Sequence, residues 1–230
     1  MNTKLIEHLS SFITERRVQL FDTVLNLRTR YMTIVLEDIY QAHNASAVLR
    51  SCECFGIQDV HFIENQNQYR ISPDVALGAH KWLNITRYNK DMQNTAAAIE
   101  ILKKNGYRIV ATTPHNNDCN IQDFDLQKGK FALIFGAELN GLTPVALDLA
   151  DEFVKIPMVG FTESLNISVT AALCIHLLAD KIRNNHLIKW QLREEEMQCI
   201  KLNWLRTSIK KSDLIEKAFI KQLNRRNKEN

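Results

Sequence analysis

The chain has 230 residues, 45% of them hydrophobic, and is long enough to bury one sizeable core, either as a single domain or as a central domain with appended helices. Its longest apolar run, residues 169–179, contains Thr170 and His176 and is far shorter than the roughly 20 residues that a bilayer requires, which excludes a transmembrane helix. Charged residues interrupt every apolar segment near the N-terminus, so we expect no signal peptide and a cytoplasmic protein.

The net charge of +3 is unevenly distributed along the chain. Residues 1–30 carry +2, residues 31–180 carry −6 and residues 181–230 carry +7. This distribution suits a catalytic body whose terminal arms hold a polyanion, with nucleic acid as the foremost candidate. The alternative is that these cations lie on solvent-exposed helix faces and bind no partner. The candidate RNA-binding cations of the two ends are Arg16, Arg17, Arg28, Arg30, Lys189, Arg193, Lys210, Lys211, Arg225 and Arg226.

The first half of the chain predicts short helices followed by a strand, a loop and a helix. Apolar residues near helical spacing predict one or two helices within residues 5–28. A β-rich run predicts a buried strand at 32–36, and Asn44 then stands where the N-cap of an apolar helix ending at Gly56 is expected. Further strands are predicted at 59–63 and 108–112, with an amphipathic helix at 91–105 between them.

The second half continues the alternation. Strands are predicted at 131–135 and 153–156, a short helix at 144–150, and longer helices at 166–183, 194–208 and 212–226. Alternating strands and helices indicate an α/β fold with a mostly parallel sheet and helices on both faces. Ligands bind such sheets beyond the carboxyl ends of the strands, so the loops after Thr112, Phe135 and Ile156 share one rim if their strands are neighbours.

The five cysteines are an odd number without metal-ligand spacing, so we expect reduced, mostly buried thiols and no metal site. Several common sites are also excluded. Residues 136–143 have the glycine spacing of a phosphate loop, but Leu142 stands where its lysine belongs. The sequence lacks the glycine fingerprint of dinucleotide-binding folds, the nucleophile elbow of α/β hydrolases and the zinc signatures of proteases and deaminases.

Three motifs in order carry the positive signal. They are Asn44-x-x-Ala47-x-x-Arg50, then Phe135-Gly136-x-Glu138-x-x-Gly141, then Ile156-Pro157-Met158 with Ser164-Leu165-Asn166-x-Ser168-x-x-Ala171. Together, over residues 32–183, they resemble the motifs of the SpoU branch of the SPOUT RNA methyltransferases. The short terminal helices, the His43-Asn44 pair and the Ser-Leu-Asn triplet are most similar to the subgroup that methylates the 2′-hydroxyl of guanosine 18 in the D-loop of tRNA.

The resemblance implies a deep trefoil knot near the C-terminal end of the catalytic domain, an exception to the rule that protein chains are unknotted. It also implies an obligate homodimer with an active site shared between subunits, and S-adenosylmethionine as the methyl donor. Its expected cofactor-binding residues are Thr112, Gly136, Gly141, Ile156, Met158 and Leu165. On this basis we expect an N-terminal RNA-binding extension at 1–30, a catalytic domain at 31–184 and a basic helical extension at 185–230.

The resemblance also suggests catalytic residues: Arg50, Asn44, Glu138, Ser164 and Asn166, with His43 as an RNA contact. A free arginine has a pKa above about 12, so we favour Arg50 as a phosphate and alkoxide ligand over Arg50 as a general base. The others would orient Arg50 and the ribose. For Glu138 the alternative is an exposed carboxylate at a helix start, and for the two glycines it is plain turn formation.

Two rival functions stay open at the level of sequence. One keeps the enzyme and changes the substrate to ribosomal RNA or to the wobble ribose of tRNA. The other is a non-catalytic RNA-binding module on the same fold, against which the presence of both Arg50 and Asn166 argues.

Overall fold

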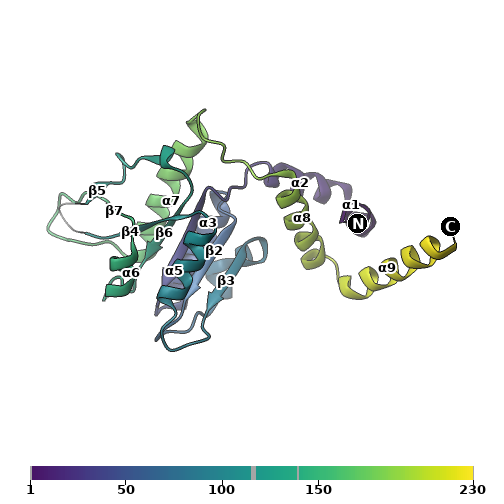
Figure 1. The fold of residues 1–230 in the computed structure, drawn as a ribbon, viewed down its shortest axis with the longest axis horizontal. Helices are drawn as coiled ribbons and strands as arrows, with labels where there is room; N and C mark the ends of the chain where they lie inside the picture. The colour runs from purple at the N-terminus through teal and green to yellow at the C-terminus, as the bar shows by residue number, and fades with distance from the viewer. Residues whose placement is uncertain (1, 115–117, 139, 230) are drawn as a thin grey trace. The chain divides into compact units, whose positions relative to one another are not determined.

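The computed structural model describes residues 2–114, 118–138 and 140–229. The chain divides into two compact units, one formed by residues 29–190 and the other by residues 1–28 together with 191–230 (Figure 1). The larger unit holds the sheet, and the smaller unit is helical. Among the described residues, none of the helices combines the length and the apolar character needed to span a membrane.

The larger unit is built on one seven-stranded sheet with the strand order β3-β2-β1-β6-β4-β7-β5 (Figure 1). Every pairing between these strands is parallel, which confirms the expected α/β class. The strands are β1 (Met32–Glu37), β2 (Asp59–Ile63), β3 (Asn84–Tyr88), β4 (Arg108–Thr112), β5 (Cys119–Asn120), β6 (Phe131–Phe135) and β7 (Glu152–Lys155).

Helices cover both faces of this sheet. On one face, α3 (Ala42–Cys54) contacts α7 (Ile167–Asn184), and on the other α5 (Thr95–Lys104) contacts α6 (Pro144–Leu149). The central strands β1 and β6 are buried along their whole length, because side chains that alternate along each strand enter two different apolar cores. The remaining short helices of this unit are α4 (Pro73–Ala76), η1 (Ala79–Trp82) and η2 (Leu126–Lys128).

Most strand predictions are confirmed, and the deviations have local causes. The predicted N-cap at Asn44 is wrong: α3 begins at Ala42 after Gln41, which places Asn44 inside the first turn with its side chain free to bond across the unit. The helix predicted from residue 91 begins at Thr95, because Asn94 first closes a turn by accepting the Lys90 and Asp91 amides. Strands β3 and β5 were not predicted.

The smaller unit consists of α1 (Asn2–Ser10), α2 (Glu15–Leu25), α8 (Glu194–Ser208) and α9 (Ser212–Glu229). Helix α8 contacts α1, α2 and α9, so the two ends of the chain form one unit. Its core includes Leu9, Phe21 and Trp204, with the Phe21 and Trp204 rings in edge-to-face contact at 5.4 Å.

Candidate active site

A cleft of about 570 Å³ lies where β6, β4 and β7 end, a volume typical of small-molecule sites. These three strands are neighbours in the sheet, so their following loops do share one rim, as predicted. The lining includes all six predicted cofactor residues, Thr112, Gly136, Gly141, Ile156, Met158 and Leu165. It also includes four of the five predicted catalytic residues, namely Asn44, Glu138, Ser164 and Asn166.

The loop after β6 folds back on itself, and this requires glycine at two positions. Ala137 and Gly141 exchange both backbone hydrogen bonds, at 3.0 and 2.9 Å. A Cβ on Gly136 would lie 2.2 Å from the carbonyl carbon of Gly141, and Gly141 itself has φ +64°. Both glycines therefore serve the loop's own closure: Gly136 admits the Gly141 backbone, and Gly141 takes the left-handed conformation.

The side chain of Asn44 joins three segments that are far apart in the sequence. Its Nδ2 donates to Glu138 Oε1 at 2.7 Å and more weakly to Gln41 Oε1 at 3.3 Å. Its Oδ1 accepts from Asn166 Nδ2 at 3.2 Å. Asn44 is only 2% exposed, so this amide is a buried connection between α3, the loop after β6 and the start of α7.

The chemistry of the partners fixes the orientation of both amides. An ionised carboxylate only accepts, so the NH₂ group of Asn44 must face Glu138. Asn166 is the N-cap of α7, and its Oδ1 accepts from the amide and the hydroxyl of Ser168 at 2.8 and 2.6 Å. Its NH₂ group is left to face Asn44. The alternative for Glu138 is an exposed carboxylate at a helix start. Glu138 is exposed, but the next helix, α6, begins only at Pro144.

Arg50 is the one predicted catalytic residue that does not line the cleft. It lies on α3 with its side chain exposed, and within the described part of the chain this side chain makes neither a hydrogen bond nor an ion pair. A guanidinium in this state is available to a ligand or a partner from outside the subunit.

Two further side chains of the lining, Cys174 and Thr112, have surroundings that limit their chemistry. Burial raises the pKa of the Cys174 thiol to about 12, so this cysteine is a neutral wall group and not a nucleophile. The hydroxyl of Thr112 donates to the Ile134 carbonyl at 2.8 Å, which fixes this side chain against β6. Across the described ranges, no three His, Cys, Asp or Glu side chains gather as a metal site would need.

Sequence reasoning missed several lining residues: Gln41, Thr113, Pro114, Lys155, Glu163, Thr170 and Cys174. A signal for two of them exists, since Thr170 and Cys174 follow Asn166 at steps of four and lie on one face of α7.

The expectation of mostly buried thiols is wrong in part. Cys52 and Cys174 are buried, whereas Cys54, Cys119 and Cys199 are exposed, and within the described part of the chain none of the five forms a disulfide.

Two of the candidate RNA-binding cations are corrected by their surroundings. Arg28 is 1% exposed and lies 5.5 Å from the Trp204 ring, so it belongs to the core of the smaller unit. Arg30 is half-buried and pairs with Asp59 at 2.8 Å. The other candidates with described side chains are exposed: Arg16, Arg17, His43, Lys189, Arg193, Lys210, Lys211 and Arg225. The Arg226 side chain lies outside the described part.

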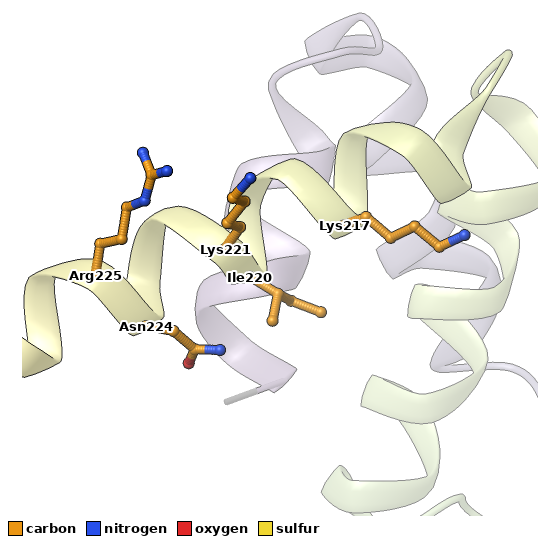
Figure 2. Close-up of a pocket in the computed structure, with 5 residues that line it drawn as sticks. All are labelled: Lys217, Ile220, Lys221, Asn224 and Arg225. Carbon is orange, nitrogen blue, oxygen red and sulfur yellow. The ribbon is translucent and has the colours of Figure 1, made fainter.

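Helix α9 adds two cations that the sequence analysis did not single out. A shallow pocket is lined only by Lys217, Ile220, Lys221, Asn224 and Arg225 of this helix (Figure 2). Figure 2 shows Lys221 and Arg225 extending from one side of α9, with Ile220 and Asn224 on the opposite side. Lys217, Lys221 and Arg225 recur every four residues, which aligns three positive charges along the helix.

The sequence of residues 31–176 matches the SpoU rRNA Methylase family. The chain belongs to this family. A tRNA (guanosine(18)-2′-O)-methyltransferase of Borreliella burgdorferi is 42% identical over 93% of this chain and 95% of its own length. The SpoU membership agrees with the three motifs and with their convergence on one cleft.

Solved SpoU-type structures show the same fold. The Aquifex aeolicus TrmH/SpoU tRNA modifying enzyme has a TM-score of 0.75 at 26% identity, and it matches 86% of this chain and 98% of that chain. The SpoU methyltransferase AviRb of Streptomyces viridochromogenes, solved with its cofactor AdoMet, has a TM-score of 0.60 at 20% identity, covering 70% and 64%.

The closure of the SpoU loop at residues 136–141 generates a first prediction. Gly136→Ala should lower the free energy of unfolding by about 1 to 3 kcal/mol, because the new methyl group must displace the Gly141 backbone. Gly160→Ala is the matched control, since its Cβ would meet only the Thr162 amide, at 4.0 Å, and should change stability by less than about 0.5 kcal/mol. Urea unfolding of both variants measures this, and equal stabilities would contradict the required close approach.

Proposed function

We propose that this SpoU-family protein transfers a methyl group from S-adenosylmethionine to the ribose 2′-hydroxyl of guanosine 18 in tRNA. The observation that carries the proposal is the convergence of the three motifs on one cleft at the carboxyl rim of the sheet. The 42% identity over nearly the whole chain to a relative of this specificity favours tRNA over ribosomal RNA.

The residues of the cleft fit S-adenosylmethionine. Backbone groups around Thr112, Ile156, Met158 and Leu165 can pair with adenine and ribose, while the apolar side chains of Ile156 and Leu165 offer surface to the base. The carboxylates of Glu138 and Glu163 also line the cleft and favour a positively charged ligand. When bound, the cofactor supplies an electrophilic methyl group on a sulfonium, and we propose that no metal takes part.

The chain's own residues would position and stabilise the acceptor. Arg50 would hold an RNA phosphate and stabilise the 2′-oxygen as its proton leaves for phosphate or water. The linked side chains of Glu138, Asn44 and Asn166, with Ser164 beside them, would orient the ribose at the cleft. A guanidinium fork suits the phosphate because it can donate two parallel hydrogen bonds.

We further propose that the protein is a homodimer whose partner supplies Arg50 to each cleft. All residues from Pro157 to Asn166 are exposed, and Val159 and Phe161 within this segment are fully so. Val169 and Leu173 continue this apolar surface along α7 at 46% and 47% exposure. An apolar surface beside a polar cleft suits a symmetric interface, and it would explain why Arg50 is absent from the lining of its own cleft.

The remaining family features are proposals of the same kind. The first is a catalytic domain over residues 31–184 with a deep trefoil knot near its C-terminal end. The second is a role in RNA binding for the segments 1–30 and 185–230. Exposed cations of both segments, including those of α9, support the second (Figure 2). With tRNA as substrate, we expect the protein to work in the cytoplasm.

The activity is tested with tritiated S-adenosylmethionine and a tRNA that contains guanosine 18. We expect incorporation at this ribose, with no change on adding EDTA. A matched tRNA with 2′-deoxyguanosine at position 18 should accept no methyl group, since it lacks only the acceptor oxygen. Equal labelling of both tRNAs, a label on the wobble ribose or preferential labelling of ribosomal RNA would contradict the assignment.

Arg50→Ala should abolish methyl transfer and leave cofactor affinity almost unchanged, and Arg50→Lys should restore little activity because it lacks the planar fork. Mixing tests the subunit from which Arg50 acts. Gly136→Ala should inactivate its own cleft, because the new methyl group displaces the Gly141 backbone in the lining. Equal amounts of Arg50→Ala and Gly136→Ala subunits, unfolded and refolded together, should then regain about a quarter of wild-type activity, since half the dimers contain one complete site. If Arg50 acted within its own subunit, every mixed dimer would be inactive.

The dimer proposal predicts that a charge on the exposed face of α7 separates the subunits. Leu173→Asp should give a monomer in sedimentation velocity experiments, because an unpaired carboxylate is costly in an apolar interface. Ile101→Asp on α5, where Ile101 is 45% exposed, is the matched control and should leave the oligomeric state unchanged. A Leu173→Asp protein that sediments as wild type would place the interface elsewhere.

The charge of α9 predicts the salt dependence of tRNA binding. Replacing Lys217, Lys221 and Arg225 by Gln should weaken binding and reduce the slope of log affinity against log salt by roughly 2 to 3, at about 0.7 to 0.9 per lost phosphate contact. The control replaces Lys90, Lys103 and Lys104 of the acidic body, which should leave the slope nearly unchanged. An equal slope for both triple variants would show that α9 is only solvated.

A further inference from the structure

A buried carboxyl group lies at the end of β1, outside the lining of the cleft. Glu37, the last residue of β1, is 1% exposed, and its two oxygens accept three hydrogen bonds. The donors are the Thr95 hydroxyl at 2.5 Å, the Thr143 hydroxyl at 2.8 Å and the Thr143 amide at 2.9 Å. In the part of the chain that the structure describes, no lysine or arginine pairs with it.

The directions of these hydrogen bonds follow from the neighbours. Thr95 Oγ1 accepts from Asn65 Nδ2 at 2.9 Å, and Thr143 Oγ1 accepts from the Ala146 amide at the start of α6. Each hydroxyl therefore has its own proton to give to Glu37. Glu37 acts only as an acceptor here. Its three donors belong to two residues, Thr95 and Thr143, that are far from β1 in the sequence.

The sheet register places Glu37 beside the cleft loop. Leu36 pairs with Phe135, so Glu37 stands next to the position where the chain leaves β6 at Gly136. Thr143, which Glu37 binds twice, lies at the other end of the same loop. Val35, two residues before Glu37, belongs to the core under α5 and α6, so Glu37 reaches Thr143 from the sheet face opposite to α3 and α7.

We propose that Glu37 is a positioning residue for the cofactor site, which holds the 136–143 loop in the conformation that binds S-adenosylmethionine. This inference rests on the proposed function. The loop is closed at its tip by the Ala137–Gly141 pair, and its end is tied to β1 only through Thr143 and Glu37 among the hydrogen bonds of the described residues. Without the hydrogen bonds between Glu37 and Thr143, a smaller fraction of the protein has the loop conformation that binds S-adenosylmethionine. The apparent affinity for S-adenosylmethionine falls by the same factor.

The test compares Glu37→Gln and Thr143→Val with a matched variant, Thr33→Val. Thr33 is also buried on β1, and its hydroxyl donates to the Asp59 carbonyl at 2.7 Å, near the amino end of the strand and far from the loop. In Glu37→Gln an NH₂ group must face donors. In Thr143→Val one donor to Glu37 is lost, together with the side-chain oxygen that caps α6. Each full-length variant is measured for its Kd for S-adenosylmethionine, its KM for tRNA and its unfolding midpoint in urea.

We expect Glu37→Gln and Thr143→Val each to raise the Kd for S-adenosylmethionine about tenfold, with an unchanged KM for tRNA. Thr143→Ser, which keeps the hydroxyl, should bind as wild type. Thr33→Val should lower the midpoint without changing the Kd. Should Glu37→Gln fail to fold, Thr143→Val decides alone. Unchanged cofactor affinity, or a loss matched by Thr33→Val at equal stability, would overturn the role. A wild-type protein that binds no S-adenosylmethionine would overturn the proposed function instead.

Discussion

The architecture of the cleft depends on one buried amide. Asn44 donates to the Glu138 carboxylate and accepts from Asn166, and so it connects α3 to the loop after β6 and to the first turn of α7. An amide is suited to this position because it can donate on one side and accept on the other, which neither a carboxylate nor an ammonium can do. Replacing Asn44 by an apolar residue would remove both hydrogen bonds and with them the connection between the three segments.

The described residues of the loop after β6, 136–138 and 140–143, are restrained from both faces of the sheet. Asn44 holds Glu138 on the cleft side, Glu37 holds Thr143 on the opposite side, and the close approach of Gly136 and Gly141 sets the shape between them. Such restraint suits a methyl transfer, in which positioning is the principal task of the protein. In the proposed function, the carboxylates of the cleft would attract the positively charged cofactor, and the exposed cations of α9 would attract RNA.

The sequence predicts β1 and two of the three cleft strands, β4 and β6, well because these strands are largely apolar runs that end at polar or glycine-rich loops. The resemblance of the three motifs also predicts about half of the residues that line the cleft. Prediction from the sequence fails where the determinant is tertiary. Asn44 is a residue type that often caps helices, but here its side chain binds Glu138, 94 residues away. Arg28 is a residue type that often binds RNA, but here it packs against Trp204. β5 has only two residues and is defined by pairing with β7, so no periodicity could reveal it.

Native-state hydrogen exchange on Asn44→Ala tests most directly whether this amide joins the cleft segments into one site. The Ala137 and Gly141 amides report on the loop after β6, and the Ser168 amide, which donates to Asn166, reports on the start of α7. If Asn44 joins them, all three amides should exchange faster in the variant, while the amides of β1 and β2 keep wild-type rates. Unchanged exchange at Ala137, Gly141 and Ser168 would show that each segment is held independently, and it would contradict the account.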